Sequence, residues 1–435
     1  MSGTALEGEM ARHKRIVICC DGTWNELDYK SRPVTNVVKL AQSIHPEGDA
    51  GDGADPVKQV VFYDEGVGTL EGESLDGGGF GDGLIQNIVD AYSFLVFNYD
   101  PGDEIFVFGF SRGAYTARSL VGMIRNCGIL RRDAAPYVDD ALMLYKDKRR
   151  KPDHPDSIEF RRTYNHPGWW IDTAADLSLQ ADNPDQKIMV SYLGVWDTVG
   201  QNGVPGVWNA MAGKAEDHGF HDLKLSRIVQ RARHAVALDE PRAAFRPALF
   251  DAGKMAALQT EAESDGRGRD AYQQLWFPGD HGSVGGGGDV TGLSDHALAW
   301  IAEGACSNGA RLSYDAEFSA VNFPVTVRDR SRGKTGTQTI RFAPSLNAPL
   351  SNVSGDWKQA NQSAMNRLLG YTLGMISRDR ITHLRDIGEV AVLAKQYEGY
   401  EGENMDYVQS LADRIRQQTR IRIAEIEAAF PTWRR

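Results

Sequence analysis

The chain has 435 residues, of which 41% are hydrophobic, and it carries a formal net charge of −11. This length is enough for one large α/β domain with appendages or for two domains. Nucleic-acid binding needs clustered Lys and Arg side chains to contact phosphates, so the acidic balance argues against nucleic acid as a partner. The basic run Lys146–Lys151 is short, and we interpret it as solvated surface.

The cysteines and the N-terminus indicate where the chain folds. Cys19, Cys20, Cys127 and Cys306 form neither a disulfide framework nor a metal-type spacing, so we expect all four to be reduced and buried. Residues 1–14 are polar, lack the apolar stretch of a signal peptide and are expected to be disordered. No window approaches the ~20 apolar residues of a spanning helix. We expect a protein that is cytoplasmic where it is made, and export without a cleaved signal stays open.

Predicted strands and helices alternate over the first third of the chain. Apolar runs predict strands at 15–20, 59–63 and 104–110, and periodic runs predict helices at 36–43 and 84–99. This alternation implies right-handed crossovers and a parallel sheet. Because the strands are almost continuously apolar, we expect helices on both faces of that sheet. The glycine-rich segment 72–83 predicts a loop.

The alternation stops at residues 131–186, a polar stretch that contains Trp169-Trp170 and that we interpret as an insert or cap. Further strands are predicted at 187–195, 234–238 and 274–277, followed by a helix at 293–305. We therefore predict one α/β domain over 15–310. The C-terminal extension, 311–435, is polar and partly β-like at first and is expected to be mostly helical, at 357–380 and 405–430.

A serine lies where the strand at 104–110 gives way to a helix. Gly109-Phe110-Ser111-Arg112-Gly113 fits the nucleophile elbow, G-x-S-x-G, in which bulky residues two before and two after the serine would clash with the strand or the helix. A plain glycine turn is the alternative. The strand before and the helix after favour the elbow, and the positive end of that helix would favour a developing oxyanion.

A serine hydroxyl needs a general base, and in this architecture a histidine follows an acid along the chain. His281 follows the last predicted strand among small residues and is the base that we predict. His234 begins a strand and is interpreted as structural. Asp197 and Asp239 each follow a strand and qualify as the acid: the usual position favours Asp239, whereas the glycine-containing turn favours Asp197.

An oxyanion hole needs two backbone N–H groups. We expect one from Arg112, directly after the serine, and one from the loop after the strand at 15–20, from Gly22 or Thr23. Asp21 is expected to pin that loop by accepting hydrogen bonds. The sequence thus predicts a serine ester hydrolase that uses no cofactor and no metal ion.

Two other function classes fit some of the same residues. Asp21, Asp64, Asp197, Asp280 and His281 all lie at predicted strand ends. Carboxylates with a histidine can hold divalent ions, as in a metal-dependent phosphohydrolase. The other alternative is a non-catalytic hydrolase fold that serves as an interaction module. Activity that a chelator abolishes and that does not need Ser111 would indicate the phosphohydrolase. A protein with an intact Ser111 that cleaves no ester would indicate the interaction module.

Four motifs together resemble a known family: CCDGTWN at 19–25, GFSRGAYTAR at 109–118, GVWDTVG at 194–200 and WFPGDHGSVGGG at 276–287. In this order they are similar to the catalytic domain of the type VI secretion phospholipase effectors of the first family, over roughly residues 14–310. The resemblance implies an α/β-hydrolase fold and a triad of Ser111, Asp197 and His281. Family members often carry an acidic residue where this chain has Ser283.

The resemblance also implies the substrate, an ester and, in characterised members, a phospholipid. The insert with Trp169-Trp170 and the C-terminal region would then form a lid that contacts a membrane surface. The alternative is that both tryptophans are core residues of the insert. A soluble ester would suit the same machinery, and the sequence does not indicate an oligomeric state.

Overall fold

The computed structural model describes most of the residues before position 315. These are residues 13–22, 34–48, 56–66, 79–171, 173, 186–199, 225–237, 240, 245, 247–277, 279–288, 291–306 and 311–314, and the backbone of 322–329 and 334–341. The first twelve residues of the predicted disordered N-terminus and the predicted helices at 357–380 and 405–430 lie outside these ranges. Lys14 lies within them, and its ammonium group binds Asp100 and Asp103 at 2.7 and 2.5 Å.

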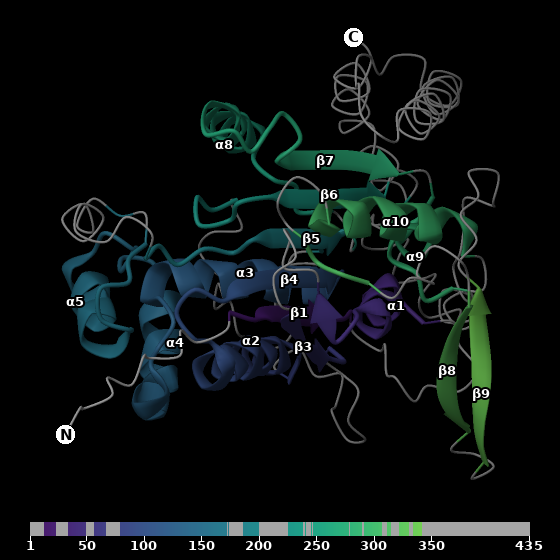
Figure 1. Cartoon of the computed structure of the whole chain (residues 1–435), viewed down its shortest axis with the longest axis horizontal. Helices are drawn as coiled ribbons and strands as arrows, with labels where there is room; N and C mark the ends of the chain where they lie inside the picture. The colour runs from purple at the N-terminus through teal and green to yellow at the C-terminus, as the bar shows by residue number, and fades with distance from the viewer. Residues whose placement is uncertain are drawn as a thin grey trace, which may run out of the picture.

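A seven-stranded sheet forms the centre of the described structure (Figure 1). Across the sheet the strands are β2 (Glu47–Gly48), β3 (Val57–Asp64), β1 (Arg15–Cys20), β4 (Glu104–Phe110), β5 (Tyr192–Trp196), β6 (Ala232–Ala237) and β7 (Tyr272–Phe277). All neighbouring pairs are parallel except β2 with β3. The predicted, mainly parallel α/β sheet is confirmed, and the two-residue antiparallel strand β2 was not predicted.

Helices occupy the connections between these strands. In chain order they are α1 (Asn36–Ser43), α2 (Gly79–Asn98), α3 (Arg112–Cys127), the 3₁₀ helix η1 (Arg132–Tyr137), α4 (Val138–Lys146), α5 (Pro155–Tyr164), α8 (Ala252–Ser264), α9 (His281–Gly285) and α10 (Gly292–Cys306). No helix among the described residues is long and apolar enough to cross a membrane. Helix α8 was not predicted from the sequence.

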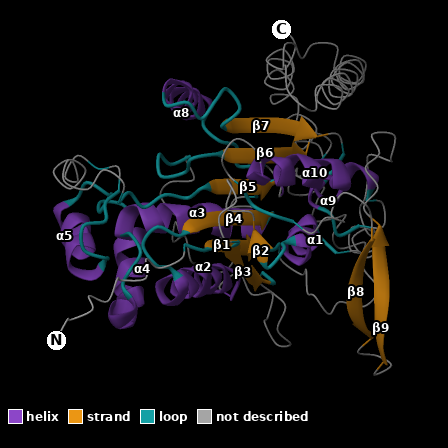
Figure 2. Ribbon diagram, in the orientation of Figure 1, coloured by secondary structure: helices purple, strands orange, loops and turns teal. Residues whose placement is uncertain are grey.

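The helices cover both faces of the sheet (Figure 2). Ile16 and Ile18 of β1 belong to one hydrophobic core with α2 and α3. Val17 and Cys19 of the same strand belong to the other core, with α1 and α10. Because successive strand residues point to opposite faces, one buried strand joins the two cores. This arrangement confirms the expectation drawn from the continuously apolar strands.

The described part of the insert packs at the end of the sheet where the strands begin. Arg132 donates to the carbonyl of Phe97 at the end of α2, and Arg161 of α5 donates to the carbonyl of Asn126 at the end of α3, both at 2.9 Å. Figure 1 places α4 and α5 at the opposite end of the molecule from α1 and α9. The expectation of a cap is therefore wrong for η1, α4 and α5.

The two tryptophans of the insert are part of its packing. Trp170 is buried, and its backbone pairs with Gln186 and Ile188. Trp169 is partly buried against the core that contains α2 and α3. The core interpretation is confirmed for Trp170, and Trp169 is partly buried.

The chain remains packed on the main body beyond residue 310. Tyr314 pairs with Ile44 after α1, and Ser313 exchanges hydrogen bonds with the Gln59 amide of β3. Strands β8 (Asn322–Asp329) and β9 (Lys334–Arg341) then form an antiparallel pair, in keeping with the β-like character predicted there. Cys19, Cys20 and Cys127 are buried thiols as predicted, whereas Cys306 at the end of α10 is exposed, so that expectation was wrong.

Candidate active site

The carboxyl ends of the central strands meet at one edge of the sheet, which we call the carboxyl edge. Cys20, the last residue of β1, lies opposite Asp64 of β3 and Gly109 of β4. Phe110, the last residue of β4, lies opposite Trp196, the last residue of β5. The residues that follow β1, β4 and β5 are therefore brought to the same edge, where open α/β sheets place their ligands.

Ser111 lies on a strained turn between β4 and α3. Its φ and ψ angles are 57° and −121°, a conformation that costs a non-glycine residue about 1–3 kcal/mol. A Cβ atom on Gly113 would overlap the backbone oxygens of Cys20 and Asp21, and one on Gly109 would overlap the backbone of Gly113. The two glycines thus allow β1, β4 and α3 to approach closely. The serine itself, rather than a glycine, takes the strained position.

Two short hydrogen bonds join Ser111, His281 and Asp197. The His281 Nε2 atom lies 2.8 Å from Ser111 Oγ, and its Nδ1 atom lies 2.5 Å from Asp197 Oδ2. All three side chains are buried, with exposed fractions of 6%, 6% and 1% in the order serine, histidine, aspartate. A carboxylate only accepts, so it holds the ring proton on Nδ1 and leaves Nε2 to accept from the serine hydroxyl. Asp239, the alternative acid, lies outside the described residues.

The turn after β5 aims the Asp197 carboxylate at the histidine. Asp197 has a positive φ of 35°, and its N–H donates to the carbonyl of Ala235 at 2.7 Å. Its Oδ1 atom accepts from the N–H of Ala237 at 2.9 Å, while Oδ2 faces His281. Both carboxylate oxygens are therefore bonded, and strand β6 holds the acid in place from the backbone.

His281 is positioned by the start of helix α9. Its backbone N–H donates to Glu240 Oε2 at 3.1 Å, and Glu240 is 1% exposed. Asp280, directly before it, caps the helix by accepting from the N–H and the hydroxyl of Ser283, each at 2.9 Å. Ser283, which replaces the acid that the resemblance led us to expect, is thus part of this cap.

Aromatic rings enclose the imidazole on two sides. The rings of Phe110 and Phe245 lie 4.5 and 4.8 Å from that of His281, centroid to centroid. Sequence reasoning missed Phe245 and the role of Glu240. The only signal for Glu240 was its place just after β6, and nothing in its local sequence marked Phe245.

His234 has a structural role, as predicted. It is fully buried in β6, and burial lowers its pKa to about 3, so the ring stays neutral. Its Nδ1 lies 2.9 Å from Gln274 Oε1, an oxygen that also accepts from the N–H of Phe250, so Nδ1 carries the ring proton. Its Nε2 accepts from the N–H of Thr198 at 3.2 Å. His234 therefore holds the residue that directly follows Asp197.

Asp21 pins the loop after β1, as expected. The side chain is fully buried and accepts from the N–H of Gly22 at 2.6 Å, the hydroxyl of Thr35 at 2.5 Å and the hydroxyl of Tyr63 at 2.9 Å. Burial raises the pKa of Asp21 to about 7 despite these bonds. The N–H of Gly22 is therefore engaged by its own neighbour.

Of the other two oxyanion candidates, Thr23 lies outside the described residues. Arg112 is the first residue of α3, and the first N–H groups of a helix have no carbonyl partner within that helix.

The acidic residues that the structure describes at the carboxyl edge each have a partner within the protein. Among the residues that the structure describes, no three His, Cys, Asp or Glu side chains are arranged to hold an ion. Asp197 binds His281, Asp280 caps α9 and Asp21 binds hydroxyl groups. Burial raises the pKa of Asp64 to about 6. Asp21, Asp197 and Asp280 are thus each engaged by hydrogen bonds within the protein.

Comparison with known proteins identifies one matching family. Residues 14–304 match the family model described as "T6SS, Phospholipase effector Tle1-like, catalytic domain". An uncharacterised protein of Saccharomyces cerevisiae is 28% identical in an alignment of 252 positions that covers 54% of this chain and 33% of the yeast protein. The chain thus spans about a third of the length of this curated relative.

Three solved structures show weaker likeness. The Tle1 effector bound to the VgrG spike of the type VI secretion system is 18% identical, with 66% of this chain and 55% of that chain covered and a TM-score of 0.36. An uncharacterised protein from Pseudomonas aeruginosa is 14% identical, with coverages of 96% and 62% and a TM-score of 0.38. Acyl-protein thioesterase 2 of Zea mays is 9% identical, with coverages of 68% and 95% and a TM-score of 0.22. At these scores we draw no argument from the three structures.

Proposed function

We propose that this chain, which belongs to the family of Tle1-like type VI secretion phospholipase effector catalytic domains, cleaves carboxylic esters of phospholipids with Ser111 as the nucleophile. Membership of the family makes it a lipase-type hydrolase. The observation that carries the finer proposal is the unbroken series of hydrogen bonds from Ser111 Oγ through the His281 ring to Asp197.

The reaction proceeds by two acyl transfers. His281 Nε2 takes the proton from Ser111 as Oγ attacks the ester carbonyl, and it then gives that proton to the leaving alcohol. Asp197 keeps the imidazole in the reactive tautomer and stabilises its cation. A water molecule, activated by the same histidine, then releases the fatty acid from the serine.

The negative charge of the tetrahedral intermediate needs two backbone donors. We assign one to the N–H of Arg112 at the start of α3, where the helix dipole adds to its effect. The loop after β1 supplies the other. Because the N–H of Gly22 is engaged by Asp21, we assign this donor to Thr23.

The direct test is fatty-acid release from phospholipid vesicles, measured by mass spectrometry on the full chain. We expect release with the wild type, loss with Ser111→Ala, and no change with the chelator EDTA. Ser264→Ala is the matched control, because Ser264 lies at the end of α8, where its hydroxyl donates to the carbonyl of Glu261. If the Ser111→Ala variant still releases fatty acid and EDTA abolishes this release, the result would indicate the phosphohydrolase. A folded wild type that cleaves no ester would indicate an interaction module.

A further inference from the structure

A cavity of about 390 Å³ lies along helix α3, outside the site that contains Ser111. Its walls come from the second half of α3, the connection between α4 and α5, the region around β5 and the first turn of α8. In Figure 1, α4, α5 and α8 lie far from α1 and α9. Since a helix rises 1.5 Å per residue, Arg118 and Arg125 lie about 10 and 20 Å along α3 from the serine.

The lining of this cavity is strongly cationic. Arg118, Arg125, Arg150, Lys151 and Lys254 line it, against the two carboxylates of Asp147 and Asp153. Arg149 and Arg150 bind the Asp147 carboxylate at 3.0 and 3.2 Å, which offsets its charge. A formal excess of three positive charges therefore surrounds a concave site in a chain whose net charge is −11. Such a site concentrates anions from solution.

The floor of the cavity is apolar and holds one cation in place. Val121, Leu193 and Phe250 line the cavity and are buried. The guanidinium of Arg118 lies 4.9 Å from the centre of the Phe250 ring and donates to the carbonyl of Ala248. A fixed guanidinium on an apolar floor loses little freedom when it binds an anion, which favours affinity.

The rim of the cavity carries two lysines in unusual settings. Within the described part of the chain, neither Lys151 nor Lys254 forms an ion pair. Lys254 lies in the first turn of α8, where its charge opposes the helix dipole. A cation there does not stabilise the helix, whereas an anion bound between the two lysines would offset both charges.

One uncharged polar group completes the lining. Asn126, 3% exposed, lines the cavity. Its amide oxygen has no hydrogen-bond partner among the residues described, and its amide nitrogen lies 3.9 Å from the sulfur of Cys127. A buried amide without a full set of partners is costly, so a ligand hydroxyl would stabilise it once the side chain rotates toward the cavity.

Part of this cavity comes from the basic run that we interpreted as solvated surface. The basic residues of the run are all exposed, including Arg150 and Lys151. Arg150 and Lys151, at the end of the same run, line the cavity. The run therefore has a role that its composition alone did not reveal.

We propose that this cavity binds a small, soluble phosphate monoester that carries hydroxyl groups. The arginines match the geometry of phosphate oxygens, and the rim lysines add charge without a fixed orientation. The volume admits more than a bare phosphate ion, and the amide of Asn126, rotated toward the cavity, is the partner that we assign to the hydroxyl groups. The site is separate from Ser111, so it does not depend on which ester that serine cleaves.

The test is calorimetric titration of the full chain with glycerol 3-phosphate at constant ionic strength. We expect saturable binding to the wild type that Lys151→Gln/Lys254→Gln weakens about tenfold or more, because two charges are lost. Lys146→Gln is the matched control, since this exposed lysine of the same basic run is not part of the lining, and it should bind like the wild type. Circular dichroism confirms that each variant is folded.

Three outcomes would overturn the proposal. No saturable binding at millimolar glycerol 3-phosphate would exclude the ligand class. Equal affinity in the wild type and the double variant would exclude the cavity. A parallel experiment measures binding to vesicles of phosphatidylcholine with phosphatidic acid. If the protein binds these vesicles through Lys151 and Lys254 but does not bind glycerol 3-phosphate, the site would be assigned to a lipid headgroup instead.

Discussion

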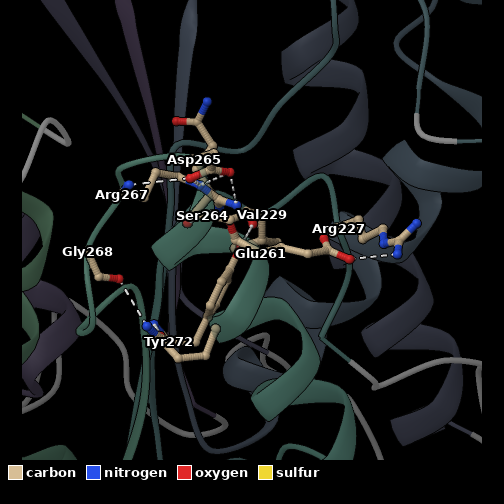
Figure 3. Close-up of polar contacts among 10 residues, drawn as sticks. Arg227, Val229, Glu261, Ser264, Asp265, Arg267, Gly268 and Tyr272 are labelled. Atoms are coloured by element: carbon tan, nitrogen blue, oxygen red, sulfur yellow. Dashed lines mark hydrogen bonds and ion pairs between the residues drawn. The ribbon is translucent and has the colours of Figure 1, made fainter.

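The two ends of the sheet hold their polar side chains in opposite ways. At the carboxyl edge, Asp21, Asp197 and His281 are almost fully buried. At the other end, which we call the amino edge, some ion pairs have one buried partner, as in Lys14 with Asp103, and others lie in partial contact with water. Figure 3 shows Arg227 with Glu261, and Arg267 with Asp265 beside Tyr272. The side chains of Arg227 and Glu261 are 50% and 43% exposed, so solvent screens their charges.

Under the proposed function, this difference separates the groups that perform chemistry, Asp197 and His281, from groups that stabilise the fold. Burial without water is costly to charged groups, and the positive φ angles of Ser111 and Asp197 add strain at the carboxyl edge. Such costs persist where function requires them. The exposed pair of Arg227 and Glu261 at the amino edge is of a kind that is individually weak, typically ~0–1 kcal/mol. Changes at the carboxyl edge should therefore alter activity strongly, and changes at the amino edge should alter little.

The largest expected effect is on activity. Asp197→Asn should lower kcat/KM for ester hydrolysis by about 10⁴-fold, because an amide no longer holds the reactive tautomer of His281. Asp265→Asn, the amino-edge counterpart, should leave kcat/KM within about twofold. Steady-state hydrolysis of a soluble ester measures both. Asp239→Asn belongs in the same series, and a larger loss there than in a folded Asp197→Asn would transfer the role of the acid to Asp239.

The next effect is steric and concerns two glycines. Gly113→Ala should cost about 3 kcal/mol or more of unfolding free energy, because its Cβ would overlap backbone oxygens that cannot move aside. Gly266→Ala, in the turn after α8, should cost only about 1 kcal/mol, since it has a positive φ of 84° but no atom within 4 Å of the added Cβ. Urea denaturation measures both values. Similar costs at the two positions would contradict the tight contact between β1 and α3.

A third effect distinguishes the two edges by the sign of their pH dependence. Burial raises the pKa of Asp21 to about 7, so the folded state binds a proton that the unfolded state releases near pH 4. The contribution of Asp21 to the free energy of unfolding is therefore fully present below pH ~4. It is lost as pH rises from about 4 to 7, by at most ~4 kcal/mol. Asp21→Asn should thus become more stable relative to the wild type as pH rises from 5 to 8.

Asp265 should show the opposite sign. Its hydrogen bond with Arg267 lowers the pKa of this carboxyl group, so its contribution is present above pH ~4 and is lost as pH falls further. The difference between Asp265→Asn and the wild type should be constant from pH 5 to 8. Denaturation curves across this range measure both variants. A difference for Asp21→Asn that does not change with pH would show that Asp21 is ionised in the folded protein.

The smallest effect concerns the pair of Arg227 and Glu261, at 2.6 Å. Arg227→Gln should lower the free energy of unfolding by less than about 1 kcal/mol, because both side chains are half-exposed. The difference should shrink further in 1 M salt, which screens exposed charges. A loss of several kcal/mol that salt does not reduce would show that the amino edge is not the solvated, weakly coupled region described above.

The residues of the candidate site were predictable because each follows an apolar strand. Ser111, Asp197 and His281 come just after β4, β5 and β7, and parallel topology alone brings such positions to one edge. The glycines around Ser111 carried a second, steric signal. By contrast, Glu240 and Phe245 act through contacts with His281 that no local pattern encodes.

The misassigned parts of the fold depended on tertiary contacts. Residues 131–186 were predicted as an insert or cap, but the end of the sheet on which η1, α4 and α5 pack is set by contacts with α2 and α3, such as two hydrogen bonds that each join residues 35 positions apart. Helix α8 has no strong apolar stripe, with only Leu258 and Ala262 buried, so its periodicity was weak. The engagement of Gly22 by Asp21 is a side-chain contact that a motif cannot show.

The most direct test of the account is labelling of the purified full chain with a fluorophosphonate probe, which reacts with activated serines. We predict stoichiometric labelling of Ser111 in the wild type, shown by peptide mass spectrometry, that EDTA does not reduce. Labelling should disappear in Ser111→Ala and fall strongly in His281→Ala. A folded wild type that is not labelled, or that is labelled at another residue, would contradict the claim that His281 and Asp197 activate Ser111.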